Sequence, residues 1–230
     1  MMSDLVAAQR QFGTGPLSRV AAIVYRLIVV ELLLLACVLP GLVPALLLAR
    51  DPSNIPLYAV CAIPLGPALS AALYALAQHR PDITDLNPAA DFRRGYLANL
   101  GGVLRLWLPL LAGLTIVAIN LAYFGAAGVP TWWAVLLVLI AVAATVWGGT
   151  ALVITSLFAF RTRDVARLAA HFLTRTPGVS LGVLALAVMA VGITAYTSEA
   201  VLALAGAVLA LLLLRTSRPM TTAIEKEFTK

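Results

Sequence analysis

Residues 106–160 read LWLPLLAGLTIVAINLAYFGAAGVPTWWAVLLVLIAVAATVWGGTALVITSLFAF and contain no charged side chain. As one helix this stretch would be about 80 Å long, whereas the hydrocarbon core of a bilayer is about 30 Å thick. The chain must therefore turn back, and the sequence GAAGVP at 125–130 favours a turn. Trp132 and Trp133 follow it, as expected at a membrane interface. We predict two membrane spans that are joined by this turn.

The composition of the whole chain agrees with this interpretation. Of the 230 residues, 62% are apolar and 11% are charged, and the mean hydropathy is +0.98. A soluble domain carries about 25% charged residues, because its surface must face water. The composition excludes a water-soluble fold and predicts a polytopic membrane protein.

Hydrophobic runs elsewhere in the chain extend the same prediction to an all-α bundle of six transmembrane helices in one membrane domain, 1–230. The predicted spans are residues 20–49, 56–78, 106–124, 132–160, 178–196 and 200–214. Polar turns at 50–54 and 196–199 separate the first two and the last two spans. The last apolar run is too long for one crossing and only just long enough for two, so we place the second turn within it.

The distribution of positive charge predicts the orientation of these spans. With six crossings, all of the 16 Lys and Arg residues except Arg50 fall on one side of the membrane. The positive-inside rule makes that side cytoplasmic and places both termini there. Because the basic residues lie in short segments between apolar runs, we attribute the net charge of +6 to topology and expect no nucleic-acid partner.

Two cytoplasmic loops are predicted to form short amphipathic elbow helices at the membrane surface. In the first elbow the residues of interest are Asp91, Phe92, Arg93, Arg94 and Tyr96. In the second they are Arg163, Asp164, Arg167 and Phe172. Such helices can simply set topology, or they can dock a cytoplasmic or membrane partner, because aromatic residues and arginine are enriched in interfaces.

Glu31 is the acidic residue that lies well inside a predicted span. It lies about 16 Å from the cytoplasmic end of the first span, near the middle of the bilayer. An ionisable residue at that depth is either a hydrogen-bonding contact between helices or part of a proton or substrate site. The candidate intramembrane polar site consists of Glu31, Thr115, Thr150 and Asn120, with both threonines at the depth of Glu31.

Motifs for cofactor chemistry are not found in the sequence. Cys37 and Cys61 lie in separate apolar runs, and His79 and His171 each stand alone. No nucleotide-binding loop and no metal-ligand spacing is present. We therefore expect no cofactor, no metal and no catalytic site.

Several segments together resemble the YesL-like family of bacterial membrane proteins. They are Glu31-Leu32-Leu33-Leu34, Pro40-Gly41, Leu65-Gly66-Pro67-Ala68-Leu69-Ser70-Ala71-Ala72-Leu73-Tyr74, Asp91-Phe92-Arg93-Arg94-Gly95-Tyr96, Asn99 and Trp107. The second elbow resembles the later half of that family. The family pattern has asparagine at the position of Glu31 and tryptophan at that of Leu34.

The resemblance implies a bacterial cytoplasmic-membrane protein that accompanies carbohydrate ABC transport, with no settled activity of its own. Our leading hypothesis is a non-enzymatic accessory component of sugar uptake. Its candidate partners are membrane lipids, a transporter permease or other membrane protein, and a second copy of the chain. The alternative is a small-molecule carrier with a substrate or proton site near Glu31. A lipid-modifying membrane enzyme is a third hypothesis.

Overall fold

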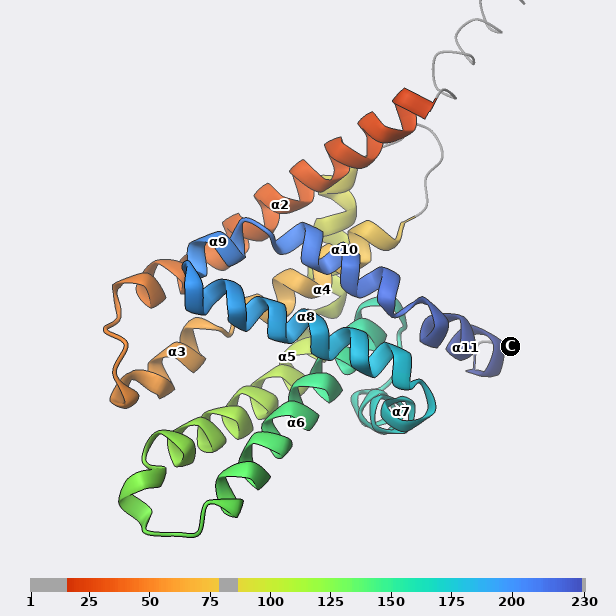
Figure 1. The fold of residues 1–230 in the computed structure, drawn as a ribbon. Helices are drawn as coiled ribbons and strands as arrows, with labels where there is room; N and C mark the ends of the chain where they lie inside the picture. The colour runs from red at the N-terminus through yellow and green to blue at the C-terminus, as the bar shows by residue number, and fades with distance from the viewer. Residues whose placement is uncertain (1–15, 79–86, 229–230) are drawn as a thin grey trace, which may run out of the picture.

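The computed structural model describes residues 16–78 and 87–228, and within these ranges the chain forms helices and no strand (Figure 1). The elements are α2 (Pro16–Leu47), η1 (Pro52–Asn54), α3 (Ile55–Cys61), α4 (Leu65–Ala77), α5 (Pro88–Ala122), η3 (Phe124–Ala127), α6 (Trp132–Leu157), α7 (Thr162–Arg175), α8 (Pro177–Tyr196), α9 (Glu199–Ala203), α10 (Gly206–Thr216) and α11 (Arg218–Phe228). The predicted all-α class is therefore confirmed for these residues.

Among the described residues, four helices are long and apolar enough to cross a membrane. They comprise Val20–Leu47 of α2, together with α5, α6 and α8. A fifth crossing is obtained if the segments Pro52–Cys61 and Leu65–Ala77, which meet at a 41° bend, count as one span. The predicted second span is therefore two helices rather than one. The predicted sixth span is also divided, into α9 and the 11-residue α10.

The three turns that the sequence predicted are all present. Between α5 and α6 the backbone passes through η3 and then Gly128, which has a φ of 64°, a conformation that glycine adopts without steric strain. Between α2 and α3, Asp51 accepts a hydrogen bond from the backbone N–H of Ser53 at 2.8 Å. Hydrogen bonding by the side chain of Ser53, and next by its backbone N–H, holds the pKa of Asp51 below its usual range. The Tyr58 hydroxyl donates to the carbonyl of Leu48 in the same turn.

The first predicted elbow is not a separate helix, and this prediction is wrong. Residues 91–97 form the beginning of α5, which continues without a break for 35 residues, or about 52 Å. Pro88 at its first turn and the Asn87 side chain, which accepts from the Ala90 N–H, fix its start. We expected a separate helix because the charged residues looked like a boundary between a loop and a membrane span. Arginine is a good helix former, however, and does not end a helix.

The helix α4 lies at the centre of the bundle and packs against α2, α5, α6 and α10. Its small side chains allow this close packing, and Ala68, Ala71, Ala72 and Ala75 have no exposed surface. Where α2 meets the end of α3, a Cβ atom on Gly41 would lie 2.0 Å from the carbonyl oxygen of Cys61. Glycine is thus required for that approach of two backbones.

The turns and terminal helices separate toward opposite ends of the bundle. The turns that join α2 to α3, α5 to α6 and α8 to α9 lie at the left of Figure 1. The helices α7 and α11, with the beginnings of α2 and α8, lie at the right. An ion pair between Arg50 and Glu199, with 3.3 Å from Nη2 to Oε1, connects two of the turns on the left.

Candidate functional site

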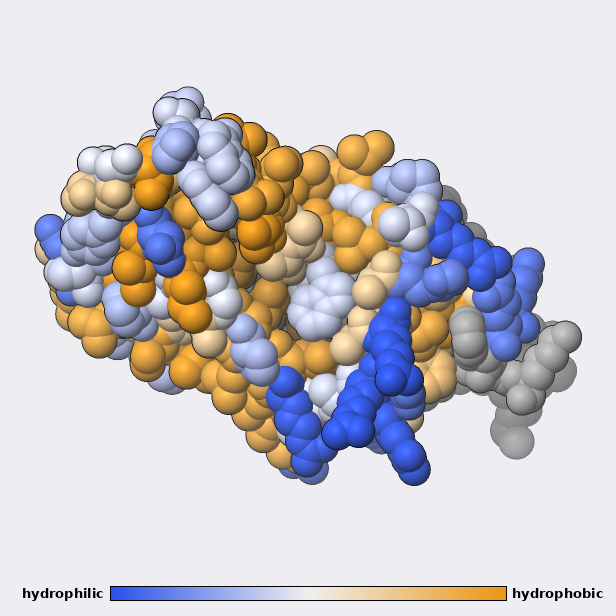
Figure 2. All heavy atoms as spheres, turned by 90° about the horizontal axis from the view of Figure 1, so that it is seen from below, coloured by the Kyte–Doolittle hydropathy of each residue, from blue (hydrophilic) through white to orange (hydrophobic). Residues whose placement is uncertain are grey.

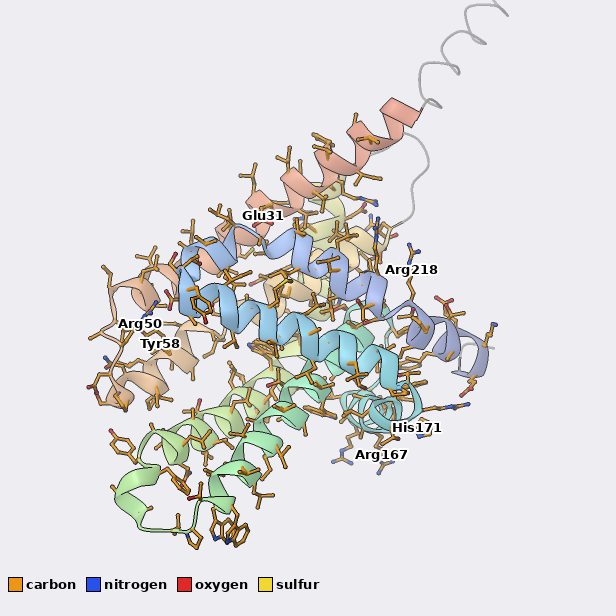
Figure 3. All side chains as sticks on the ribbon, viewed as in Figure 1. Glu31, Arg50, Tyr58, Arg167, His171 and Arg218 are labelled. Carbon is orange, nitrogen blue, oxygen red and sulfur yellow. The ribbon has the colours of Figure 1, made fainter. Side chains whose placement is uncertain are left out.

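The most distinctive polar contact inside the bundle is made where the last apolar segment is broken. Helix α9 ends at Ala203, and α10 begins at Gly206 after a short turn. Ala207, in the first turn of α10, donates its backbone N–H to Glu31 Oε2 at 2.5 Å. Figure 3 shows Glu31 on α2 beside the segment that contains α9 and α10.

Glu31 therefore caps α10 from another helix. The first N–H groups of a helix have no partner within it, and the helix dipole places partial positive charge at that end. A carboxylate on α2 satisfies one such N–H and complements the dipole. The bond joins residues that are 176 positions apart in the chain.

Gly206 makes this contact sterically accessible. A Cβ atom at Gly206 would lie 2.9 Å from Leu34 Cδ2 and 3.5 Å from Glu31 Oε1. Leu34 is 1% exposed and lies one turn after Glu31 on the same face of α2. The beginning of α10 therefore packs directly onto the face of α2 that carries the acid.

The second oxygen of the carboxylate, Glu31 Oε1, is buried and has no hydrogen-bond partner among the described residues. The candidate partners from the sequence do not supply one. Thr115 donates to the carbonyl of Leu111 at 2.7 Å, and Thr150 donates to that of Val146 at 2.9 Å.

Asn120 likewise bonds within its own helix, to the carbonyl of Ile116, and its side chain is exposed. The hydrogen bonds given for these three side chains do not connect them to Glu31, so their grouping into one site with Glu31 stays a prediction. Residues at equal depth lie at the same level of the membrane, but equal depth does not show which helices are neighbours.

A second polar cluster, which the sequence did not single out as a site, joins α4, α5 and α6. Ser156 donates to Ser70 Oγ at 2.9 Å. Asn99 donates to the carbonyl of Ser156 at 3.2 Å and lies 3.4 Å from Ser70 Oγ. Ser70 and Ser156 are buried, with 0% and 2% exposure. Ser70 and Asn99 both occur in the segments that resemble the YesL-like family, and this was the only sign of the cluster in the sequence.

Two tryptophans use their indole N–H groups to connect helices. Trp107 on α5 donates to the carbonyl of Ala62 at 3.0 Å, in the break between α3 and α4. Trp147 on α6 donates to the carbonyl of Ala166 on α7 at 3.1 Å. The first bond gives a second donor to the Ala62 carbonyl, which also accepts from the backbone N–H of Leu65 at 3.2 Å.

The predicted elbow residues divide into buried and exposed sets. Asp91, Phe92 and Phe172 are 1%, 3% and 1% exposed, so they hold the helices in the bundle and are not accessible to a partner. Tyr96 is half-buried. The exposed members are Arg93, Arg94, Arg163, Asp164 and Arg167. The residues of the second elbow lie on a separate helix, α7, and its apolar face is covered by the bundle.

The helix α11 was not predicted. Met220 and Ile224, one turn apart, are completely buried, and Arg175 at the end of α7 forms two hydrogen bonds of 2.8 and 2.9 Å with Glu227. Proline in its first turn and the i, i+4 spacing of the two apolar residues were the signals available.

Within the part of the chain that the structure describes, no group of three or more His, Cys, Asp or Glu side chains could hold a metal ion. Comparison with known protein families, curated proteins and solved structures finds no match to this chain.

Proposed function

We propose that this chain is a non-enzymatic accessory protein of the bacterial cytoplasmic membrane that takes part in carbohydrate uptake by an ABC-type transporter. The link to carbohydrate uptake rests on the resemblance to the YesL-like family. The segments that carry it include α4, the beginning of α5, Asn99 and Trp107, which together make the centre of the bundle.

The proposed topology has six crossings and both termini in the cytoplasm. Two ion pairs support it. Arg50–Glu199 connects two turns assigned to the outside, and Arg175–Glu227 connects two segments assigned to the cytoplasm. In this topology α3 with α4, and α9 with α10, are broken spans.

One observation favours an accessory role over a carrier. Polar side chains of the described bundle bond to neighbouring helices, as in Ser156–Ser70, Trp107–Ala62 and Glu31–Ala207, or to their own helix, as Thr115 and Thr150 do. The groove between α5 and α6 beside Trp107 has a volume of about 10 Å³, which is room for about one water molecule. A bundle held together in this way supports binding to a partner.

The proposal is tested in a host grown on the carbohydrate. The tagged chain is crosslinked in the membrane and purified, and uptake of radiolabelled sugar is measured with and without its gene. We expect a carbohydrate ABC permease to be recovered with the wild-type chain, to be lost with Arg93→Glu/Arg94→Glu, and to be retained with the control Arg215→Glu/Arg218→Glu. Unchanged sugar uptake without the gene, together with no recovered permease, would contradict the proposal.

A carrier remains the second candidate function, because of the unpaired Glu31 Oε1 at a helix break. Transporters commonly place substrate or ion sites where a membrane helix is discontinuous. The purified chain in liposomes would then move solute or protons on its own, and Glu31→Gln would abolish that movement. If liposomes that contain the wild-type protein move neither solute nor protons, this candidate is excluded.

A further inference from the structure

The surface between α5, α6 and α7 combines an apolar groove with unpaired positive charge. Leu106, Trp107 and Leu110 of α5 and Trp147, Ala151 and Leu152 of α6 line what we call the α5–α6 groove. The groove is shallow, with room for about one water molecule, and its lining is apolar. Leu110, Ala151 and Leu152 are buried, so the half-buried Leu106, Trp107 and Trp147 supply the apolar surface that a ligand can contact.

Three arginines lie on the helices that form this groove or pack beside it. Arg105 directly precedes the lining residue Leu106 on α5, and it is exposed. On the other side, the indole of Trp147 bonds to Ala166 of α7, which also packs against α5. Arg163 and Arg167 flank Ala166 and lie one turn apart on the exposed face of α7.

The positive charge at this edge is not neutralised by the protein. Arg105, Arg163 and Arg167 form no ion pair with any described residue. Asp164, the acidic residue of α7, forms no ion pair with these arginines. Glu227 is paired with Arg175 instead. Figure 3 shows Arg167 pointing away from the bundle, and Figure 2 shows long hydrophilic side chains gathered toward one side of a largely apolar face.

We propose that the α5–α6 groove and its three arginines bind an anionic phospholipid. Arginine holds phosphate with two parallel hydrogen bonds, and basic pockets between membrane helices on the cytoplasmic side suit anionic headgroups. An acyl chain lies along the apolar surface next to the arginines, against the half-buried Trp107 and Trp147. A soluble phosphate would use the charge but gain nothing from the tryptophan-lined groove, so the two features together select a lipid.

This inference depends on the chain residing in a membrane and is independent of the carbohydrate proposal. It is tested with the groove's own tryptophans. In a Trp132→Phe/Trp133→Phe background, the remaining tryptophans are Trp107 and Trp147, both in the groove. The protein is reconstituted in equal amounts of phosphatidylglycerol and phosphatidylcholine, with bromine on the acyl chains of one lipid at a time. Bromine quenches the fluorescence of a tryptophan that it contacts.

We expect brominated phosphatidylglycerol to quench more than brominated phosphatidylcholine, because each arginine near an anionic surface contributes a factor of about five in binding. Arg105→Gln/Arg163→Gln/Arg167→Gln should make the two lipids quench equally. Substitution of the same three positions by Lys should keep most of the difference, and high salt should weaken it.

The matched control removes three positive charges elsewhere, by Arg215→Gln/Arg218→Gln/Lys226→Gln, and should leave the preference for phosphatidylglycerol unchanged. Equal quenching by both lipids in the parent protein would overturn the proposal. So would a preference that survives loss of the three groove arginines, or one that the control abolishes equally.

Discussion

Glu31 contributes to stability through one oxygen. Glu31→Ala removes the acceptor for the Ala207 N–H, and loss of a helix cap in apolar surroundings should lower the free energy of unfolding by about 1–2 kcal/mol. Glu31→Gln keeps an acceptor oxygen, so it should lose less. Unfolding of the purified protein in a denaturing-detergent titration measures both. Equal losses for the two variants would contradict the capping role.

Gly41 is required by a backbone contact, which gives a second prediction at this scale. Gly41→Ala would place a Cβ atom 2.0 Å from the carbonyl oxygen of Cys61, which belongs to the backbone and cannot rotate away. We expect a loss of about 1–3 kcal/mol. Gly113→Ala is the matched control, because a Cβ there meets no atom within 4 Å. It should be neutral or stabilise α5 by up to about 1 kcal/mol.

Among the helices, α11 depends on a contact that its own sequence does not supply. The ion pair between Arg175 and Glu227 is exposed, so it should contribute about 0.2–1 kcal/mol. We expect Arg175→Ala to increase hydrogen exchange in residues 218–227 more than in α8, and high salt to do the same in the wild-type protein. A Glu227→Ala/Arg175→Ala double variant should add little to either single one. Full additivity would show that the two side chains are independent.

The sequence predicted the long helices better than the breaks. For the first, fourth and fifth spans the hydrophobic runs end within a few residues of α2, α6 and α8, because a helix must be apolar along its length to cross a bilayer. Pro64 and Pro67 permit a kink in the predicted second span, but they do not show that the helix breaks at residues 62–64. Proline occurs in membrane helices with and without a break, and α2 continues through both Pro40 and Pro44. The Trp107–Ala62 bond at the break is a tertiary contact.

The candidate site was predicted only in part, for the same reason. Glu31 was recognised from its depth and charge, and it does form the polar contact with α10. Its partner is a backbone N–H, which leaves no mark in the sequence. Every residue except proline carries such a group, and the break at Ala205 frees this one.

For the whole molecule, the proposed topology is tested by cysteine labelling. In a Cys37→Ala/Cys61→Ala background, Ser53→Cys and Ser198→Cys should react with a membrane-impermeant maleimide in intact cells. Thr174→Cys and Thr222→Cys should react only after the membrane is opened. All four positions lie in or next to turns, or on exposed helix faces. Labelling of Ser53→Cys and Ser198→Cys on opposite sides would contradict six crossings.

The bond between Glu31 and Ala207 has a consequence for biogenesis, because α2 is synthesised long before α10 and Glu31 lies 176 residues ahead of its partner. An acid without a partner in lipid is unfavourable. We therefore expect chains that stop before α10 to be retained by the insertion machinery or degraded, so that α2 depends on the completion of α10.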